Sequence, residues 1–440
     1  MSYYNMQPWG GALGNPTNQA KAEFAHDLEV GLSRKSVPEF EQLPLIGMAA
    51  KLALHIRGLG SIDGPVLRLV ADHFFDIPAI ALTSVLNLLA EVEFVQIITE
   101  GRSVKTVVPT VPHFSSVYGG LGEYLGTITL NEHEELAIAM LGELRAKPEK
   151  RDALINRLGA DGAVFKRVES ITAEGGLVLP KRARGQDVLV SPFYFADNLD
   201  ALATQAAAGG ARHVERVLEL IQKAQGWPLS LIISRGEING TKLSSDDLQM
   251  LRELVADGVL RPPSLTNTLT STSEYFVFTP HPGAQRLDGA AREIYERTMA
   301  LVAAVRKGQL LPQRFRIRSP VAILSKLRNT KRIGASTEAA QQYMNLVALR
   351  VGKMNRVKDD WYEFVLIDTP ENVQAVDDAI ALFEDGEPLS MGVSEDARIA
   401  LQRDESYVQS VIGASKLRVI ERPPMTPQIR AEMDQLLLDL

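Results

Sequence analysis

The fold is decided by the segments IALTSVLNLLAE (80–91), FVQIIT (94–99) and SVKTVVP (103–109). The first segment has apolar side chains at helical spacing. The other two are rich in Val and Ile, which favour the pleated surface of a strand. A Glu-Gly pair separates the last two segments, so the stretch predicts a helix followed by a β-hairpin that ends at a proline.

The same pattern recurs along the chain as a helix, a Gly-containing turn and two β-rich segments. The triplet Ala-Asp-Gly follows the second and third helices, where glycine is a natural C-cap. Self-similarity at a nearly constant period indicates several copies of one module. The closing prolines stand at 109, 192, 280 and 370. The later copies are expected as helices 150–158, 245–255 and 336–351, first strands 163–168, 259–260 and 353–357, and closing strands 187–192, 274–280 and 361–370.

A helix, a tight turn, a second helix and a two-stranded hairpin resemble the winged-helix superfamily. In the first copy, Gly64–Phe75 would be the first helix, Asp76–Pro78 the break and Ala79–Glu91 the helix in the recognition position. The resemblance covers about half of the chain and is one of pattern. It implies an α+β fold of tandem winged-helix-like modules, helical with short β-hairpin wings. Proteins of this superfamily commonly place a helix in the DNA major groove with the wing beside it.

The expected domain organisation follows from these copies. Residues 1–20 contain no charged side chain and many Gly, Asn and Pro residues, which predicts a disordered arm. A first module is expected at 21–118, a second at 119–211, a third at 212–305 and a basic fourth at 306–440. The fourth includes an amphipathic helix at its C-terminal end, with an apolar stripe formed by Met433, Leu436, Leu437 and Leu440.

Charge is distributed very unevenly. Residues 306–358 contain thirteen Lys or Arg residues and a single acid, Glu338, which gives this stretch a net charge of +12. The whole chain has a net charge of −7, so the rest sums to −19. Concentrated like charge opposes the compact state, and a polyanion that releases counterions on contact is the common reason to keep it. The leading partner is therefore DNA, and a solvated basic face without a partner is the alternative.

The fourth copy supplies the candidate DNA-binding residues. Its helix is expected to expose Gln and Asn side chains, which can pair with adenine, and its first strand is a basic wing. Three alternating arginines upstream are expected to point to one face of a strand. The candidates are Arg314, Arg316, Arg318, Lys326, Arg328, Lys331, Arg332, Gln341, Gln342, Asn345, Arg350, Lys353, Arg356 and Lys358.

The other copies look less suited to DNA. The first offers the uncharged Thr83, Ser84 and Asn87 on its recognition-position helix. The third offers mainly acids, which repel phosphate, so both are expected to contact proteins, to mediate self-association or to pack internally. The acids of the third are Asp246, Asp247, Glu253 and Asp257. A second basic cluster, Lys181, Arg182 and Arg184, is either a wing tip or a solvated loop.

Signals for catalysis are weak. The chain has no cysteine, which excludes disulfides and thiolate metal sites, and its seven histidines show no metal-ligand spacing. His133–Glu134 begins a zinc-binding pattern, but Ala137 stands where the second ligand is needed. We expect no cofactor and no metal. No apolar run reaches the length of a membrane span and no secretory signal is visible, so we expect a cytoplasmic protein without a membrane partner.

These observations favour a non-catalytic DNA-binding protein: a regulator, a replication or partition factor, or a DNA-recruiting subunit of a larger complex. Two alternatives remain open. One is a structural interaction subunit whose basic tract binds an acidic protein partner. The other is a magnesium-dependent nuclease that uses Asp360, Glu363 and Asp368, because carboxylates can hold magnesium beside phosphate.

Overall fold

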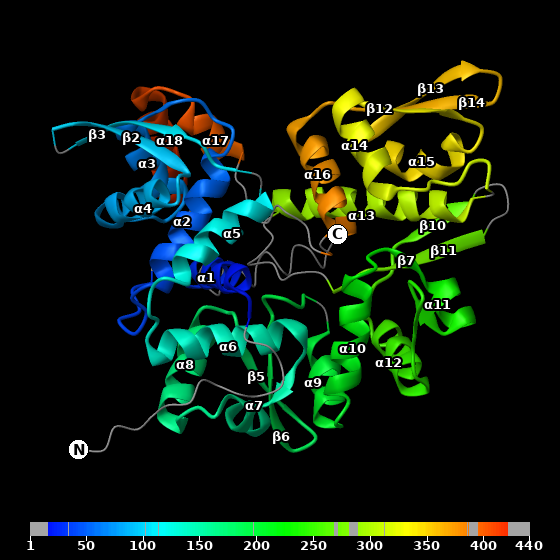
Figure 1. Cartoon of the computed structure of the whole chain (residues 1–440), viewed down its shortest axis with the longest axis horizontal. Helices are drawn as coiled ribbons and strands as arrows, with labels where there is room; N and C mark the ends of the chain where they lie inside the picture. The colour runs from blue at the N-terminus through cyan, green and yellow to red at the C-terminus, as the bar shows by residue number, and fades with distance from the viewer. Residues whose placement is uncertain are drawn as a thin grey trace, which may run out of the picture. The chain divides into compact units, whose positions relative to one another are not determined.

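The computed structural model describes residues 16–33, 35–101, 103–112, 114–196, 198–267, 272–280, 289–311, 313–384, 386 and 395–420. Helices alternate with small antiparallel sheets, so the expected α+β class is confirmed (Figure 1). Most of the expected arm, and the expected helix at 426–440, lie outside the described residues. The last part of the arm is helical, because α1 (Asn18–Leu32) begins at the Thr17 cap.

The chain divides into two compact units. One contains residues up to Gly47 and Tyr118–Val393, and the other contains Met48–Val117 and the segment from Ser394. The chain passes from one unit to the other inside α2 (Leu43–Ile56) and again inside α5 (Phe114–Leu125). The second and third expected modules therefore lie in one unit with most of the fourth, whereas most of the first lies in the other unit with the segment from Ser394.

The two helices and the hairpin expected at 64–109 form as predicted. Strand β1 (Ile62–Asp63) leads into α3 (Gly64–Phe74), which Asp63 caps by accepting a hydrogen bond from the Val66 amide at 3.2 Å. Asp76, with φ +56°, and Pro78 separate α3 from the next helix. The remaining elements are α4 (Ala79–Glu91), β2 (Val95–Glu100) and β3 (Ser103–Pro109), and the sheet order is β1-β3-β2.

The end of the described chain completes this unit. Helices α17 (Glu395–Leu401) and α18 (Glu405–Ile420) contact α3. Arg398 Nη1 donates hydrogen bonds to the backbone oxygens of His55 at 2.7 Å and Arg57 at 3.0 Å, so it caps the end of α2. The expected fourth module, 306–440, is therefore divided between the two units, because α17 and α18 pack on α3.

The second module shows where local reasoning was wrong. Its elements are α6 (Glu132–Ala146), β4 (Glu149–Lys150), α7 (Arg151–Leu158), α8 (Gly162–Glu174), β5 (Leu179–Ala183) and β6 (Gln186–Val190), with sheet order β4-β6-β5. The strand expected at 163–168 lies inside α8. Asp161 accepts hydrogen bonds from the amides of Ala163 and Val164, so the Ala-Asp-Gly triplet starts a helix here.

In the third module the same triplet does end a helix. Gly258, with φ +70°, follows α12 (Ser245–Ala256) in the expected C-cap conformation, but 259–260 is not a strand. The two triplets are therefore not equivalent positions of a repeat. Helix α9 (Leu199–Ala207) lies within the bounds of the second module and packs on its sheet. The other elements of the third module are α10 (Ala211–Gln222), β7 (Trp227–Pro228), α11 (Leu229–Arg235), β8 (Glu237–Ile238), β9 (Thr241–Lys242), β10 (Ser264–Asn267) and β11 (Thr272–Val277).

The fourth module has one helix, rather than two, between its first strand and its hairpin. Its elements are α13 (Gly289–Leu310), α14 (Pro320–Thr330), β12 (Arg332–Ser336), α15 (Ala339–Ala348), β13 (Gly352–Lys358), β14 (Trp361–Leu366) and α16 (Pro370–Glu384). In all four modules the first strand pairs with the last, which gives the order first-third-second. The four modules therefore share the strand order of their three-stranded sheets, whereas the helices between the strands differ.

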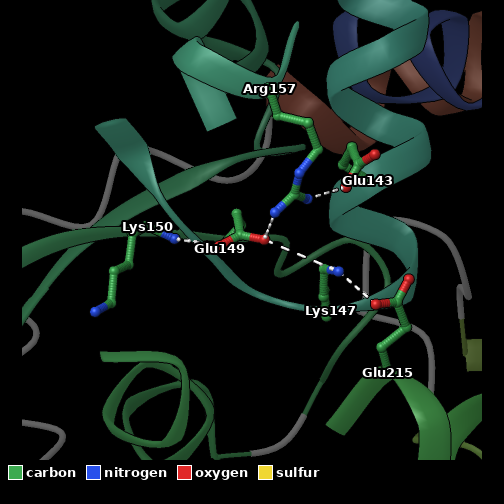
Figure 2. A network of polar contacts seen from close by, with 6 residues as sticks. All are labelled: Glu143, Lys147, Glu149, Lys150, Arg157 and Glu215. Carbon is green, nitrogen blue, oxygen red and sulfur yellow. Dashed lines mark hydrogen bonds and ion pairs between the residues drawn. The ribbon is translucent and has the colours of Figure 1, made fainter. Parts of the chain in front are cut away.

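Buried polar contacts join the second module to the third. Lys147, 2% exposed, lies between Glu149 of β4, at 3.9 Å, and Glu215 of α10, with which it forms a close ion pair (Figure 2). Arg157 of α7 contacts Glu149 at 2.7 Å and Glu143 of α6 at 2.6 Å. Each buried charge in this network faces an opposite charge, as burial requires.

A second joint connects the third module to the fourth. Arg306 of α13 lies over the rings of Trp227 and Phe383, and its Nε donates to the backbone oxygen of Gln225 at 3.0 Å. Phe276 of β11 and Phe364 of β14 belong to one continuous buried cluster. Desolvation lowers the pKa of Arg306 to about 10. The basic tract thus begins with a cation that is built into the core.

Candidate nucleic-acid interface

Three of the predicted DNA-binding cations are paired with carboxylates of their own module. Arg328 Nε lies 2.8 Å from Asp377, and Lys331 Nζ lies 2.7 Å from Asp368. Arg332 is 3.9 Å from Glu363. Lys331 also ends α14, with φ +60°, so these cations stand at a helix end and the following turn as expected. Their charge is largely compensated within the protein.

The remaining candidate cations stay exposed. Within the described residues none of them has a carboxylate at ion-pair distance, although Arg356 donates to the backbone oxygen of Asp359. Eight cations therefore have no compensating acid in the described part of a chain whose net charge is negative. They are Arg314, Arg316, Arg318, Lys326, Arg350, Lys353, Arg356 and Lys358.

Arg314, Arg316 and Arg318 lie on a loop, and the strand expected here is wrong. The arginine loop (residues 313–319) has turn and irregular backbone, yet exposure still alternates along it, so all three arginines face solvent. Ile317 packs on the core and its amide donates to the Gly308 oxygen at 3.0 Å. Because Ile317 is held against the core, the arginines on either side of it face solvent although the segment forms no strand.

Gln342 does not have the predicted role of reading bases. Its side chain is 5% exposed, and its Nε2 donates to the Ala304 oxygen at 3.0 Å. A Cβ at Gly308 would lie 2.3 Å from both Gln342 Nε2 and Ile317 Cδ1. Gly308 thus permits close packing of two neighbours, the arginine loop and helix α15. Gln342 is part of the joint that places the three arginines beside this helix.

Helix α15 presents a more apolar outer face than its sequence suggested. Asn345 is half-buried, whereas Met344 is 52% exposed and Leu349, just after the helix, is 38% exposed. The side chain of Gln341 lies outside the described set. On the inner face, the Tyr343 ring lies 5.2 Å from that of Phe364, and burial raises the Tyr343 pKa. Helix α15 is thereby fixed between the sheet and the arginine loop.

The β13–β14 hairpin, which we call the basic wing, carries cations on its solvent side. In the register of the sheet, Lys353 pairs with Val365 and Lys358 pairs with Trp361. Between them Met354 packs on the core, whereas Asn355, Arg356 and Val357 are exposed and the register shifts between Arg356 and Lys358. The turn contains two exposed acids, Asp359 and Asp360. Positive charge therefore lies along the wing rather than at its tip.

The acids of the nuclease alternative are not gathered into a site. Asp360 is at the wing tip, Glu363 accepts from Asn355 at 3.4 Å, and Asp368 pairs with Lys331. In the described part of the chain no three His, Asp or Glu side chains are placed to hold a metal ion. Glu363 and Asp368 are engaged within the fourth module and Asp360 is exposed at the turn, so nothing in their arrangement favours the nuclease.

The recognition-position helices of the other modules differ in charge. Thr83, Ser84 and Asn87 are exposed on α4, as expected, next to Ile80 at 90% exposure. On α12, Asp247 is not exposed: it accepts from the Ser244 amide and lies 2.8 Å from His213 Nδ1. Burial raises the Asp247 pKa, but the hydrogen bonds of His213 and Ser244 outweigh it and leave that pKa lowered.

The second basic cluster lies on the β5–β6 hairpin. Lys181 and Arg182 are on β5 and Arg184 is in the β5–β6 turn, with φ +48°. Lys181 pairs with Asp200 at 2.9 Å, and Arg182 is 3.7 Å from Asp187. Exposed Lys166 and Arg167 on α8 were missed, because that segment was expected to be a strand. Arg167 contacts Glu39, so this surface is only partly uncompensated.

Comparison with known proteins provides no identity: no family model matches the chain, and no curated protein is significantly similar to it. Among the described residues no single helix combines the length and the apolar composition of a membrane span. Helices α3 and α4 reach that composition only as a pair bent by 112°.

Proposed function

We propose that this protein is a cytoplasmic, non-catalytic DNA-binding protein built from tandem winged-helix-like modules. It would act as a regulator, as a replication or partition factor, or as the DNA-recruiting subunit of a larger complex. The recurrent first-third-second strand order, with helices between the first strand and the hairpin, supports the winged-helix-like assignment. The fourth module departs from this pattern by lacking one helix, and it carries the proposed DNA face.

The proposal rests on how unevenly the cations of the basic tract (residues 306–358) are paired with carboxylates. Where acids stand near its cations they form ion pairs, as at Arg328 and Lys331, yet eight exposed cations have none within the described residues. Uncompensated charge of one sign on one module is the electrostatic footprint of a polyanion site. The arginine loop packs against α15, and the basic wing belongs to the sheet that α15 contacts, so both sets of cations lie on one module.

The test is a fluorescence-anisotropy titration of the full chain with random-sequence duplex DNA at several salt concentrations. Each lost phosphate contact should lower the log–log salt slope by about 0.9. Lys353→Glu with Lys358→Glu should therefore weaken binding and lower the slope by about 2. The matched control is Arg68→Glu with Arg252→Glu, which makes the same charge change at exposed cations on α3 and α12. Equal affinities and slopes for the two double variants would refute the DNA face.

A protein-interaction subunit is the second candidate, and the exposed apolar residues favour it. Met344 and Leu349 at α15, and Ile80 on α4, are large apolar side chains that water covers in the isolated chain. In this alternative the basic tract contacts an acidic protein surface. A competition assay separates the candidates. Displacement of such a partner by excess duplex DNA would show that DNA binds the basic face, and failure to displace it would favour the interaction subunit.

A further inference from the structure

Trp361 occupies an unusual place for a tryptophan. It begins β14 on the sheet face that turns away from α15, and it is 41% exposed. The opposite face holds Phe364, fully buried, and Tyr362, packed on the core. Because side chains alternate along a strand, Trp361, Glu363 and Val365 share the outer face.

The register of the sheet places one cation beside this tryptophan and two more farther along the same face. Lys358 is directly opposite Trp361 on β13. Farther along, Val365 is paired with Lys353 on one side and Arg332 on the other, so these three form a row across the outer face. Paired residues point to the same side of a sheet. An exposed aromatic ring thus has a lysine beside it and a basic row at the other end of the strand.

The one acid on this outer face is already engaged. Glu363 accepts from Asn355, its cross-strand partner, and lies 3.9 Å from Arg332. The acids of the turn, Asp359 and Asp360, would meet phosphates if the wing tip entered a groove of duplex DNA. A strand that lies across the sheet face avoids them. The charge pattern therefore favours contact along the outer face over insertion of the tip.

We propose that the outer face of the β12-β14-β13 sheet binds single-stranded DNA, with an unpaired base stacked on Trp361 and the adjoining phosphates held by Lys358 and Lys353. Aromatic rings interleaved with cations are how proteins bind unpaired strands without sequence preference. A duplex can still contact the two lysines, but it cannot stack a base on Trp361, because its bases are already stacked on one another. The inference rests on the proposed DNA binding and names the form of DNA that this face takes.

The experiment compares oligo(dT), which cannot pair with itself, with a blunt duplex that has the same number of phosphates. Stacking of a single base should make Trp361→Ala bind oligo(dT) about tenfold more weakly or worse. Trp361→Phe, which keeps a ring, should retain most of the affinity. Duplex affinity should be unchanged in both variants, which also verifies that they are folded. Tyr275→Ala is the matched control, since Tyr275 is a 48% exposed aromatic on β11, the corresponding strand of the third module.

The outcomes separate this inference from the proposed function. If Trp361→Ala binds oligo(dT) as tightly as the unchanged chain while duplex binding persists, the platform is refuted and DNA binding stands. If neither form of DNA binds, both proposals fail. Quenching of tryptophan fluorescence by oligo(dT) that is lost in Trp361→Phe would add support, because the loss assigns the signal to Trp361 and not to Trp9 or Trp227.

Discussion

Lys147, at the end of α6, and Lys353, on the basic wing, place the same side chain in two opposite environments. Lys147 is buried between two glutamates that join the second and third modules. Lys353 faces water, and no described carboxylate lies near enough to pair with it. A buried cation must be paired, whereas an exposed one costs little to leave alone. The difference separates charge that holds this protein together from charge that is available to a partner.

The largest effect is expected where charge is buried. Lys147→Ala would leave Glu215 and Glu149 facing each other without the cation, and breaking a buried pair in this way costs about 3–5 kcal/mol. The free energy of unfolding, measured by urea titration, should fall by that amount. Lys147→Met with Glu215→Leu should recover much of the loss, because an apolar pair of similar volume needs no charge partner. No rescue by the double variant would contradict this role of the network.

An intermediate effect is expected at the joint beneath the arginine loop. Gly308→Ala adds a Cβ 2.3 Å from Gln342 Nε2 and Ile317 Cδ1, and overpacking of this kind costs roughly 1–3 kcal/mol. Although alanine favours a helix more than glycine does, we expect a net loss of stability and weaker DNA binding as the loop moves. Gly162→Ala, at a helical glycine whose added Cβ meets no atom within 4 Å, is the control. Equal stability of the two variants would show that the joint adapts.

The smallest effect compares two neighbours on α14. Arg328 is paired with Asp377 and Lys326 is exposed without an acid. Arg328→Met should cost about 0.5–1 kcal/mol of stability, as a partly exposed ion pair does, and leave the salt slope of DNA binding nearly unchanged. Lys326→Met should do the reverse, with stability constant and the slope lower by about 0.9. If both variants change the slope equally, pairing does not decide which cations meet DNA.

Local signals were enough to predict the first module within a residue or two. Asp63 caps α3, Pro78 sets the start of α4, and a Glu-Gly turn separates β2 from β3, so each boundary is fixed by neighbouring residues. The helix at 162–174 was missed because Asp161 was assigned to a helix end, although its carboxylate caps the next helix. Because Asp161 begins a helix instead of following the end of one, residues 163–168 belong to α8 and not to the predicted strand.

The candidate site was predicted less completely, because its errors come from contacts between distant residues. The alternation of Arg314, Arg316 and Arg318 gave their exposure correctly, even though the backbone is a loop. Burial of Gln342 depends on a glycine 34 positions earlier, which leaves room for its amide. Pairing of Lys331 with Asp368 likewise joins a helix end to a residue beyond the hairpin. No local pattern carries such information.

The return of α17 to the first module has a consequence for biosynthesis. Arg398 closes the end of α2 across a sequence separation of 343 residues, so this unit lacks its cap and its covering helices until ribosomes have made most of the chain. The second, third and fourth modules are contiguous and can fold as they emerge. The module synthesised first is therefore expected to mature last, and a nascent chain stalled before α17 should present it in a protease-sensitive state.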